Sequence, residues 1–378
     1  MHKKTSLIVD IKIINKMQAE KIYFDNNATT ALHPDVKIAM DKTLGNIPLN
    51  PSSVHYYGQM AANIVRDSRA EILKIALRDQ AKDYDLIFTS SGSESNNQIM
   101  KTFENDLICT SELEHPSVLK SIKNSIFIKN NQNGEIDFDN LEETIASKNP
   151  KLVSIMQANN EIGVVNDIKI AADLCKKHGV LFHTDASQSF GKIDTKFDEI
   201  LPDYITLSSH KIYGPIGVSA LIFRKNKPII PLLLGGQQEF NHRAGTQNIP
   251  AIFGFAEACK LTALAIELYR ENEKFQRQIE EAAELNGFIV AGKSATRLPN
   301  TSLLLHSEKN TSAELMKLDF LGFMASGGSA CSWGLSQKSK MPELLGYRGI
   351  NCTLRISSGI FNQAGDFDGL RRGYFNHQ

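Results

Sequence analysis

The sequence predicts an α/β fold, with a large domain built on a mostly parallel central sheet and a smaller α/β domain at the C-terminal end. Short apolar runs alternate with amphipathic stretches through the first two thirds of the chain. A long helical pattern rich in Ala, Glu, Leu and Lys then runs from Gly254 to Leu285. Beyond it the apolar rhythm becomes looser and strand-like, which indicates a second unit.

The apolar runs of the first part are expected to be the strands of the large domain. They cover residues 84–89, 106–109, 152–156, 180–184, 204–207 and 220–223. Between them, residues 58–77 and 168–178 carry apolar side chains at three- and four-residue spacing, which is typical of amphipathic helices. The later strand-like runs are 287–291 and 301–305.

The chain of 378 residues is expected to form two domains, since one domain typically spans roughly 100 to 200 residues. Residues 31–265 are predicted to form the large domain and residues 266–378 the small one. Residues 1–30 are predicted to be an N-terminal segment that packs with the small domain. In open α/β sheets ligands bind at the carboxyl ends of strands, so the residues after each apolar run are the candidates for a site.

The charge balance argues against two classes of partner. Lys and Arg number 42, and so do Asp and Glu, so bulk charge gives no attraction to nucleic acid or to an anionic membrane. No stretch reaches the ~20 apolar residues that span a bilayer. Asp10 interrupts the N-terminal apolar run before signal-peptide length, and the first arginine is Arg66, which is not typical of a mitochondrial presequence. We therefore expect a cytoplasmic protein.

The five cysteines predict neither a disulfide framework nor a metal site, because their number is odd and no CxxC pair occurs. Cys331 lies in the small-residue segment 324–334, where either an exposed nucleophile or a buried, inert thiol is compatible with the pattern. The others lie in apolar, helical or strand-like patterns and are expected in the core; they are Cys109, Cys175, Cys259 and Cys352.

Three strand ends carry groups of different chemistry. Residues 86–97 run from a strand through Ser and Gly into a helical pattern, and N–H groups at such a helix start can hold a phosphate. Asp185 ends a later strand, and Lys211 follows the next one among small residues. Each feature alone has an ordinary interpretation, because such turns are common and most lysines lie on solvated surfaces.

Together the three groups match the requirements of pyridoxal 5'-phosphate. This cofactor needs an amine for a Schiff base, a carboxylate for the pyridinium proton and a helix start for the phosphate. Lys211 would supply the amine and Asp185 the carboxylate. Without that carboxylate the ring would be a poorer electron sink for a carbanion at Cα.

Ordered segments between Ile22 and Gly359 resemble the cysteine desulfurase family, within the fold-type I, class V aminotransferase group of pyridoxal-phosphate enzymes. The matching segments are 23–30 (YFDNNATT), 50–55 (NPSSVH), 89–97, 114–115 (EH), 159–163 (NNEIG), those of Asp185 and Lys211, 243–246 (RAGT) and 329–331 (SAC). So many segments in one order are far more specific than any single motif.

The resemblance implies a role for each matched residue. The cofactor-binding set would be Gly92, Ser93, His115, Asn160, Asp185, Gln188, Ser208, His210, Lys211 and Thr246. Within this set, Lys211 would form the Schiff base, Asp185 would contact the ring nitrogen and His115 would stack on the ring. Gln188 would contact the ring hydroxyl.

The remaining roles concern the phosphate and the substrate. The phosphate would be held by Gly92, Ser93, Ser208 and His210. Thr246 would reach the phosphate of a partner subunit, which implies a homodimer with shared sites. Asn160, or its neighbour Asn159, and Arg355 would bind the substrate, Arg355 through a two-pronged grip on the carboxylate.

The activity implied by the resemblance converts L-cysteine to L-alanine and holds the sulfur as a persulfide on Cys331, in a loop of the small domain. Lys211 would move the Cα proton with help from His115, and an acceptor such as an iron–sulfur scaffold or another carrier would take the sulfur. One alternative is a selenocysteine lyase or related β-eliminating enzyme, against which Cys331 argues. Another is a degenerate, non-catalytic assembly partner, against which the retained set argues: Lys211, Asp185, His115, Cys331 and Arg355.

Overall fold

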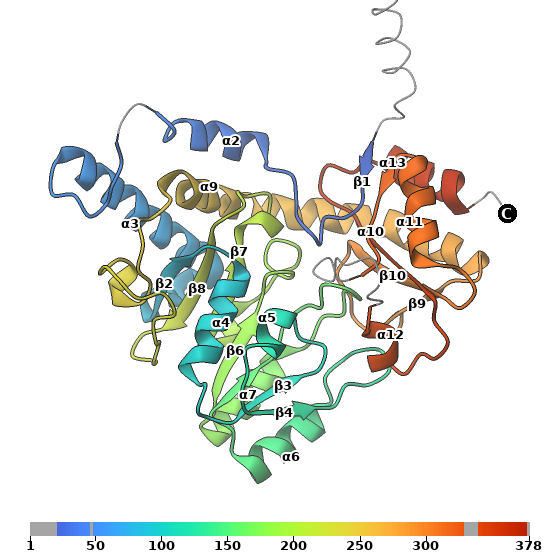
Figure 1. The fold of residues 1–378 in the computed structure, drawn as a ribbon, viewed down its shortest axis with the longest axis horizontal. Coiled ribbons are helices and arrows are strands. Elements are labelled where there is room, and N and C mark those ends of the chain that lie inside the picture. Colours follow the sequence, from blue (N-terminus) through green and yellow to red (C-terminus); the bar gives the residue numbers. More distant parts are fainter. Residues whose placement is uncertain (1–20, 46–47, 329–338, 376–378) are drawn as a thin grey trace, which may run out of the picture.

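The computed structural model describes residues 21–45, 48–328 and 339–375, and its central feature is a seven-stranded sheet (Figure 1). In spatial order its strands are β2 (Tyr84–Thr89), β8 (Ser219–Arg224), β7 (Tyr204–Ser208), β6 (Leu181–Asp185), β5 (Leu152–Ser154), β3 (Ile108–Ser111) and β4 (Ser125–Ile128). Strand β8 is antiparallel to both neighbours, and all other pairs are parallel. The predicted α/β fold with a mostly parallel sheet is confirmed.

Six of these strands lie within a few residues of the predicted runs, whereas edge strand β4 was not predicted. Ser125 and Phe127 of β4 are exposed, so this strand lacks the continuous apolar run that marks the buried strands.

Helices cover both faces of the sheet, which makes a three-layer arrangement. One face packs against α3 (Tyr56–Leu77), α6 (Phe138–Lys148), α7 (Ile168–His178) and α9 (Ile249–Lys260). The other face packs against α4 (Gly92–Thr102) and α5 (Pro116–Leu119). The central parallel strands therefore have both faces buried, as their apolar composition requires.

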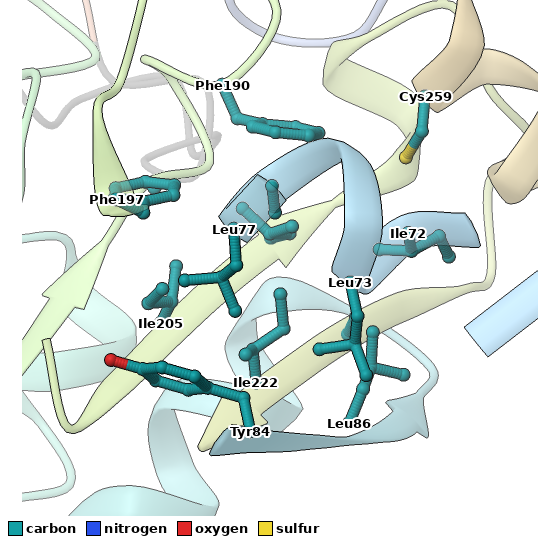
Figure 2. Close-up of a cluster of buried hydrophobic side chains, with 14 of the residues drawn as sticks. Ile72, Leu73, Leu77, Tyr84, Leu86, Phe190, Phe197, Ile205, Ile222 and Cys259 are labelled. Atoms are coloured by element: carbon teal, nitrogen blue, oxygen red, sulfur yellow. The ribbon is translucent and has the colours of Figure 1, made fainter. Parts of the chain in front are cut away.

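The amphipathic face of α3 shows how the first layer is held. Figure 2 shows Leu73 and Leu77 of α3 lying over Leu86 of β2 and Ile222 of β8, and these side chains are buried in one apolar cluster. Burying one such side chain is worth about 1.5 to 3 kcal/mol.

A second body of strands and helices is built around short sheets. The strands β12 (Cys352–Ser357), β10 (Thr301–His306) and β9 (Ile289–Val290) form an antiparallel sheet, and β1 (Ile22–Tyr23) pairs in parallel with β11 (Phe323–Met324). The apolar cluster here joins Phe24 near the N-terminal end, Ile279 of α10 (Thr262–Leu285) and Leu354 of β12. The predicted limits of the three units stay predictions.

The remaining elements are shorter. They are α2 (Pro34–Asp41), η1 (Arg78–Asp83), α8 (Phe197–Ile200), η2 (Ser209–Lys211), η3 (Glu239–Asn241), α11 (Thr311–Phe320), α12 (Met341–Leu344), α13 (Ala364–Leu370) and η5 (Arg371–Phe375).

The long helical pattern from Gly254 to Leu285 is divided in the structure into α9 and α10, which are bent by 54°. At the break, the N–H of Leu261 donates to Ala258 O, and the Thr262 hydroxyl donates to Cys259 O. The apolar spacing of the sequence continues across this break, so periodicity alone does not predict the tighter turn between α9 and α10. Within the described residues, no single helix has the length and apolarity to cross a bilayer, although the bent pair passes that test as a unit.

Candidate active site

The carboxyl ends of the central strands open into one pocket, as expected for an α/β sheet. Its lining comprises Asn27, Ala28, Ser91, Gly92, Ser93, Asn96, His115, Ser117, Met156, Ala158, Asn160, Asp185, Ser187, Gln188, Ser208, His210, Lys211 and Arg355. Segments far apart in the sequence therefore contribute to a single cavity.

Asp185 lies at the end of β6 and is almost fully buried. One carboxylate oxygen accepts a hydrogen bond from Asn96 Nδ2 at 2.7 Å, and the other accepts from the Ser187 N–H at 2.9 Å. Beneath it, the ring nitrogens of His183 contact Ser154 and Thr206, and burial lowers the pKa of His183 to about 4. The carboxylate is thus held in a fixed orientation above a neutral, hydrogen-bonded imidazole.

Lys211 ends η2, directly after β7. Its Nζ lies 2.5 Å from the main-chain oxygen of Asn27 and 2.7 Å from that of Ala28. These oxygens belong to the segment that follows β1, so the N-terminal segment fixes the amine over the pocket.

The first turn of α4 forms another side of the pocket. Ser91 is the N-cap and accepts from the Glu94 N–H, while the first N–H groups of a helix have no intrahelical acceptor. A Cβ at Gly92 would lie 3.1 Å from Ser187 Oγ, which is a tight contact, so glycine leaves more room at this side of the pocket. Ser208 and Ser93 line the pocket beside it.

His210 also lines this side of the pocket. Its Nδ1 lies 3.0 Å from Thr29 Oγ1. Burial, followed by the charge of Lys211, lowers the pKa of His210 to about 4. The ring is therefore neutral at pH 7 and can donate one hydrogen bond.

His115 caps the start of α5. The Ser117 N–H donates to His115 Nδ1 at 3.1 Å, which places the proton of the neutral ring on Nε2. Burial is the main cause that lowers the pKa of His115, and Lys211 adds to it, while Asp185 opposes it. The preceding Glu114 is fully buried, and burial raises the pKa of its carboxyl well above its usual value.

Arg355 on β12 reaches the pocket from the opposite side and is 1% exposed. One terminal nitrogen donates to the Asn160 main-chain oxygen at 3.0 Å, and the other pairs with Asp25 at 2.7 Å. Its Nε is buried and has no hydrogen-bond partner among the described residues. Asn160 lines the pocket, whereas the side chain of Asn159 accepts from the N–H groups of its own turn.

One predicted residue lies outside this pocket, and another lies outside the described residues. Thr246 is exposed and does not line it. Cys331 falls in 329–338, outside the described residues; the described chain before that segment ends at Gly328, and the main chain of Ser326 pairs with that of Arg355. All other predicted site residues line the pocket.

Sequence reasoning missed several supporting residues. Asn27 belongs to a quoted motif but received no role, and Asn96 lies within the predicted helix start. His183 and Lys192 carry little signal, because nothing in a single sequence distinguishes a buried polar side chain from an exposed one.

Comparison with known proteins places the chain in a family. The model for the aminotransferase class-V family matches residues 22–370. A cysteine desulfurase of Nostoc sp. is 35% identical over 353 residues, which cover 89% of this chain and 87% of the relative. A putative cysteine desulfurase of Bacillus subtilis is 34% identical over 370 residues, with 91% and 95% coverage.

Solved structures agree with this result. A NifS-like protein from Rickettsia africae is similar at a TM-score of 0.86 and 34% identity, covering 94% of this chain and 98% of that one. The structure of SspA in complex with cysteine gives a TM-score of 0.78 at 28% identity, covering 90% and 100%. The chain therefore belongs to the class-V aminotransferase family, and the resemblance to cysteine desulfurases predicted from its motifs is confirmed.

Proposed function

We propose that this protein is a pyridoxal-phosphate-dependent cysteine desulfurase, which converts L-cysteine to L-alanine and holds the sulfur on Cys331. The observation that carries the proposal is the gathering of Lys211, Asp185 and Arg355 in one pocket. An amine, a fixed carboxylate and a buried guanidinium are the groups that binding of the cofactor and of an amino acid requires.

The donor set of the pocket fits pyridoxal 5'-phosphate. The room left at Gly92 and the N–H groups of the first turn of α4 suit a phosphate, with Ser93, Ser208 and His210 beside them. Asp185 would hold the ring nitrogen, Gln188 the ring oxygen, and His115 and Asn160 would contact the ring. When bound, the cofactor supplies an electron sink that stabilises negative charge at the Cα of an amino acid.

Lys211 and Arg355 would handle the substrate. The guanidinium of Arg355 lines the pocket and is 1% exposed, and a charge-assisted hydrogen bond to the cysteine carboxylate is strong in such a buried setting. Lys211 Nζ would carry the proton to and from Cα, and the neutral His115 offers a second group for proton transfer.

Cys331 would take the sulfur. Its thiolate attacks the sulfur of the bound cysteine, an S–S bond forms, and the electrons of the broken C–S bond remain with the carbon fragment, which gains protons to become alanine. We propose that a carrier protein, such as an iron–sulfur scaffold, then accepts this sulfur. A reducing compartment such as the cytoplasm suits a thiol that must stay free.

We also propose that the protein acts as a homodimer. Residues 51–52, 69, 237–240 and 247 line one surface hollow. Exposed apolar side chains are Phe240 in this lining and Val54 and Tyr56 close to it in the sequence. Exposed Thr246 lies in this region, so a second copy seated here could bring its Thr246 to the first pocket. Sedimentation should give a dimer, and full activity in a monomer would contradict the shared site.

The substitution Cys331→Ala tests the sulfur chemistry. With Lys211 and the pocket intact, added cysteine should still change the visible absorption of the loaded enzyme, but no persulfide and almost no alanine should form. Cys109→Ala is the matched control, because that thiol is buried on β3 and burial raises its pKa to about 12. If Cys331→Ala forms alanine at the wild-type rate, an eliminating lyase replaces the desulfurase as the function.

A further inference from the structure

Lys192 is a fully buried lysine beside the pocket, although it does not line it. It is 1% exposed, and its Nζ lies 2.7 Å from Gln188 Oε1 and 2.6 Å from Asn27 Oδ1. Burial, followed by the charges of Lys211 and Arg355, lowers the pKa of Lys192 well below its usual value. Burying an amine without a carboxylate partner is costly, so an apolar residue would serve better if only packing mattered.

The contacts of Gln188 fix the orientation of its side-chain amide. The amine of Lys192 donates to Gln188 Oε1, and Gln188 Nε2 donates to the main-chain oxygen of Asn27 at 3.0 Å. If the amide were flipped, its NH2 group would face the donating amine and its oxygen would face another oxygen. Both contacts therefore select the same orientation.

This orientation determines what Gln188 offers to the pocket. The Nε2 group has two hydrogens, and only one is needed for Asn27. Because Gln188 lines the pocket, its second N–H is available there as a donor. A ring oxygen that carries negative charge requires a donor at this point, and an amide oxygen would repel it.

We propose that Lys192 is a positioning residue that holds the amide of Gln188 with its NH2 group toward the cofactor's ring oxygen. This inference rests on the proposed function, since it concerns the cofactor that the pocket would bind. Lys192 touches neither the cofactor nor the substrate and acts through Gln188. Lys192 also contacts the side chain of Asn27, but that side chain is held independently, because Asn27 Nδ2 donates to Thr301 Oγ1 at 2.8 Å.

A double-mutant cycle with Lys192→Met and Gln188→Met tests the proposal. Pyridoxal 5'-phosphate is titrated into each cofactor-free protein, and the pH midpoint of the visible band is measured for each loaded protein. Each single variant should bind the cofactor about tenfold more weakly and raise the midpoint by about one unit, since a hydrogen bond to a charged group is lost. The double variant should show no more than Gln188→Met alone, because Lys192 acts through Gln188.

Gln276→Leu is the control. Gln276 is also fully buried, and its Nε2 donates two hydrogen bonds, to Ser302 Oγ and Ile356 O, within the small antiparallel sheet region. It should lower stability without changing cofactor affinity or the spectral midpoint. A general loss of packing is thereby separated from a loss of positioning.

Three results would overturn the proposal: an unchanged spectrum in Lys192→Met, additive shifts in the double variant, or an equal shift in Gln276→Leu. If Lys192→Met does not fold, Lys192→Leu, which also removes the amine, takes its place in the single and the double variant. If the wild-type protein binds no pyridoxal 5'-phosphate, the proposed function fails. The contact between Lys192 and Gln188 is then tested by urea unfolding of the same variants. In urea unfolding, the double variant should lose less stability than the sum of the two single losses. Additive losses would refute the contact between Lys192 and Gln188.

Discussion

The two halves of the pocket are held in different ways. The half formed by Gly92, Asp185 and Lys211 follows the ends of strands in one hydrogen-bonded sheet. In the other half, Arg355 lines the pocket and is held by an ion pair with Asp25, a residue 330 positions away. The first half is fixed by sheet geometry, whereas the second exists only when distant segments are folded together.

This difference suggests that the two halves of the pocket have different roles. The half at the sheet edge carries the groups that suit a cofactor, and the half formed by distant segments carries the groups that suit a substrate. Asn27 connects them, because its main-chain oxygen accepts from Lys211 and its side chain donates to Thr301 of β10. Substitutions in the two halves should therefore change different measured quantities.

The largest effect is expected at the sheet edge, from Lys211→Ala. Formation of alanine should fall to background, because the amine that forms the Schiff base and carries the Cα proton is lost, and His115 only assists that transfer. The fold should persist, since the two main-chain oxygens that lose Lys211 can be solvated from the pocket. Alanine release and thermal unfolding are the measurements, and Lys225→Ala, at an exposed lysine after β8, is the control. Alanine release at the wild-type rate would refute the assignment of Lys211.

The other half should respond in substrate binding. Arg355→Ala should raise the cysteine concentration for half-maximal rate by roughly tenfold to hundredfold, because a charge-assisted pair is worth about 1.5 to 3 kcal/mol. Cofactor affinity should change much less, and steady-state kinetics and cofactor titration measure the two quantities.

Arg297→Ala is the matched control for Arg355. Arg297 is also buried, and it pairs with Glu280 at 2.7 Å near β10. Removing it should reduce stability without changing the requirement for cysteine. An unchanged cysteine requirement in Arg355→Ala would place the carboxylate anchor elsewhere.

The same division explains what the sequence could predict. The ends of β6 and β7 were found because buried strands are apolar and a charged residue after them is conspicuous, as with Asp185 and Lys211. Arg355 was assigned only through family resemblance, because its partner Asp25 lies at the other end of the chain. Nothing local predicted Lys192, whose burial depends on the packing of several segments.

The smallest expected effect lies at the outer border of the sheet-edge half, at Glu94 in the first turn of α4. Burial alone would raise the pKa of Glu94, but hydrogen bonds from Arg243 and Ser90 outweigh it and hold the pKa below its usual value. A carboxyl with a lowered folded-state pKa stabilises the fold above the unfolded-state value of about 4.5 and loses this contribution as the pH falls through the folded-state value.

Glu94→Gln should therefore lower the free energy of unfolding by about 1 kcal/mol at pH 7, and this difference should shrink as the pH falls below about 4.5. Urea unfolding at a series of pH values measures it. Glu142→Gln, which breaks an exposed pair with Lys177, should change stability too little to detect. Because Glu94 pairs with Arg243 near Thr246 and not with the second half, its loss should leave the cysteine requirement unchanged. A raised cysteine requirement in Glu94→Gln would mean that a change in α4 alters substrate binding in the other half of the pocket, so the two halves are not independent.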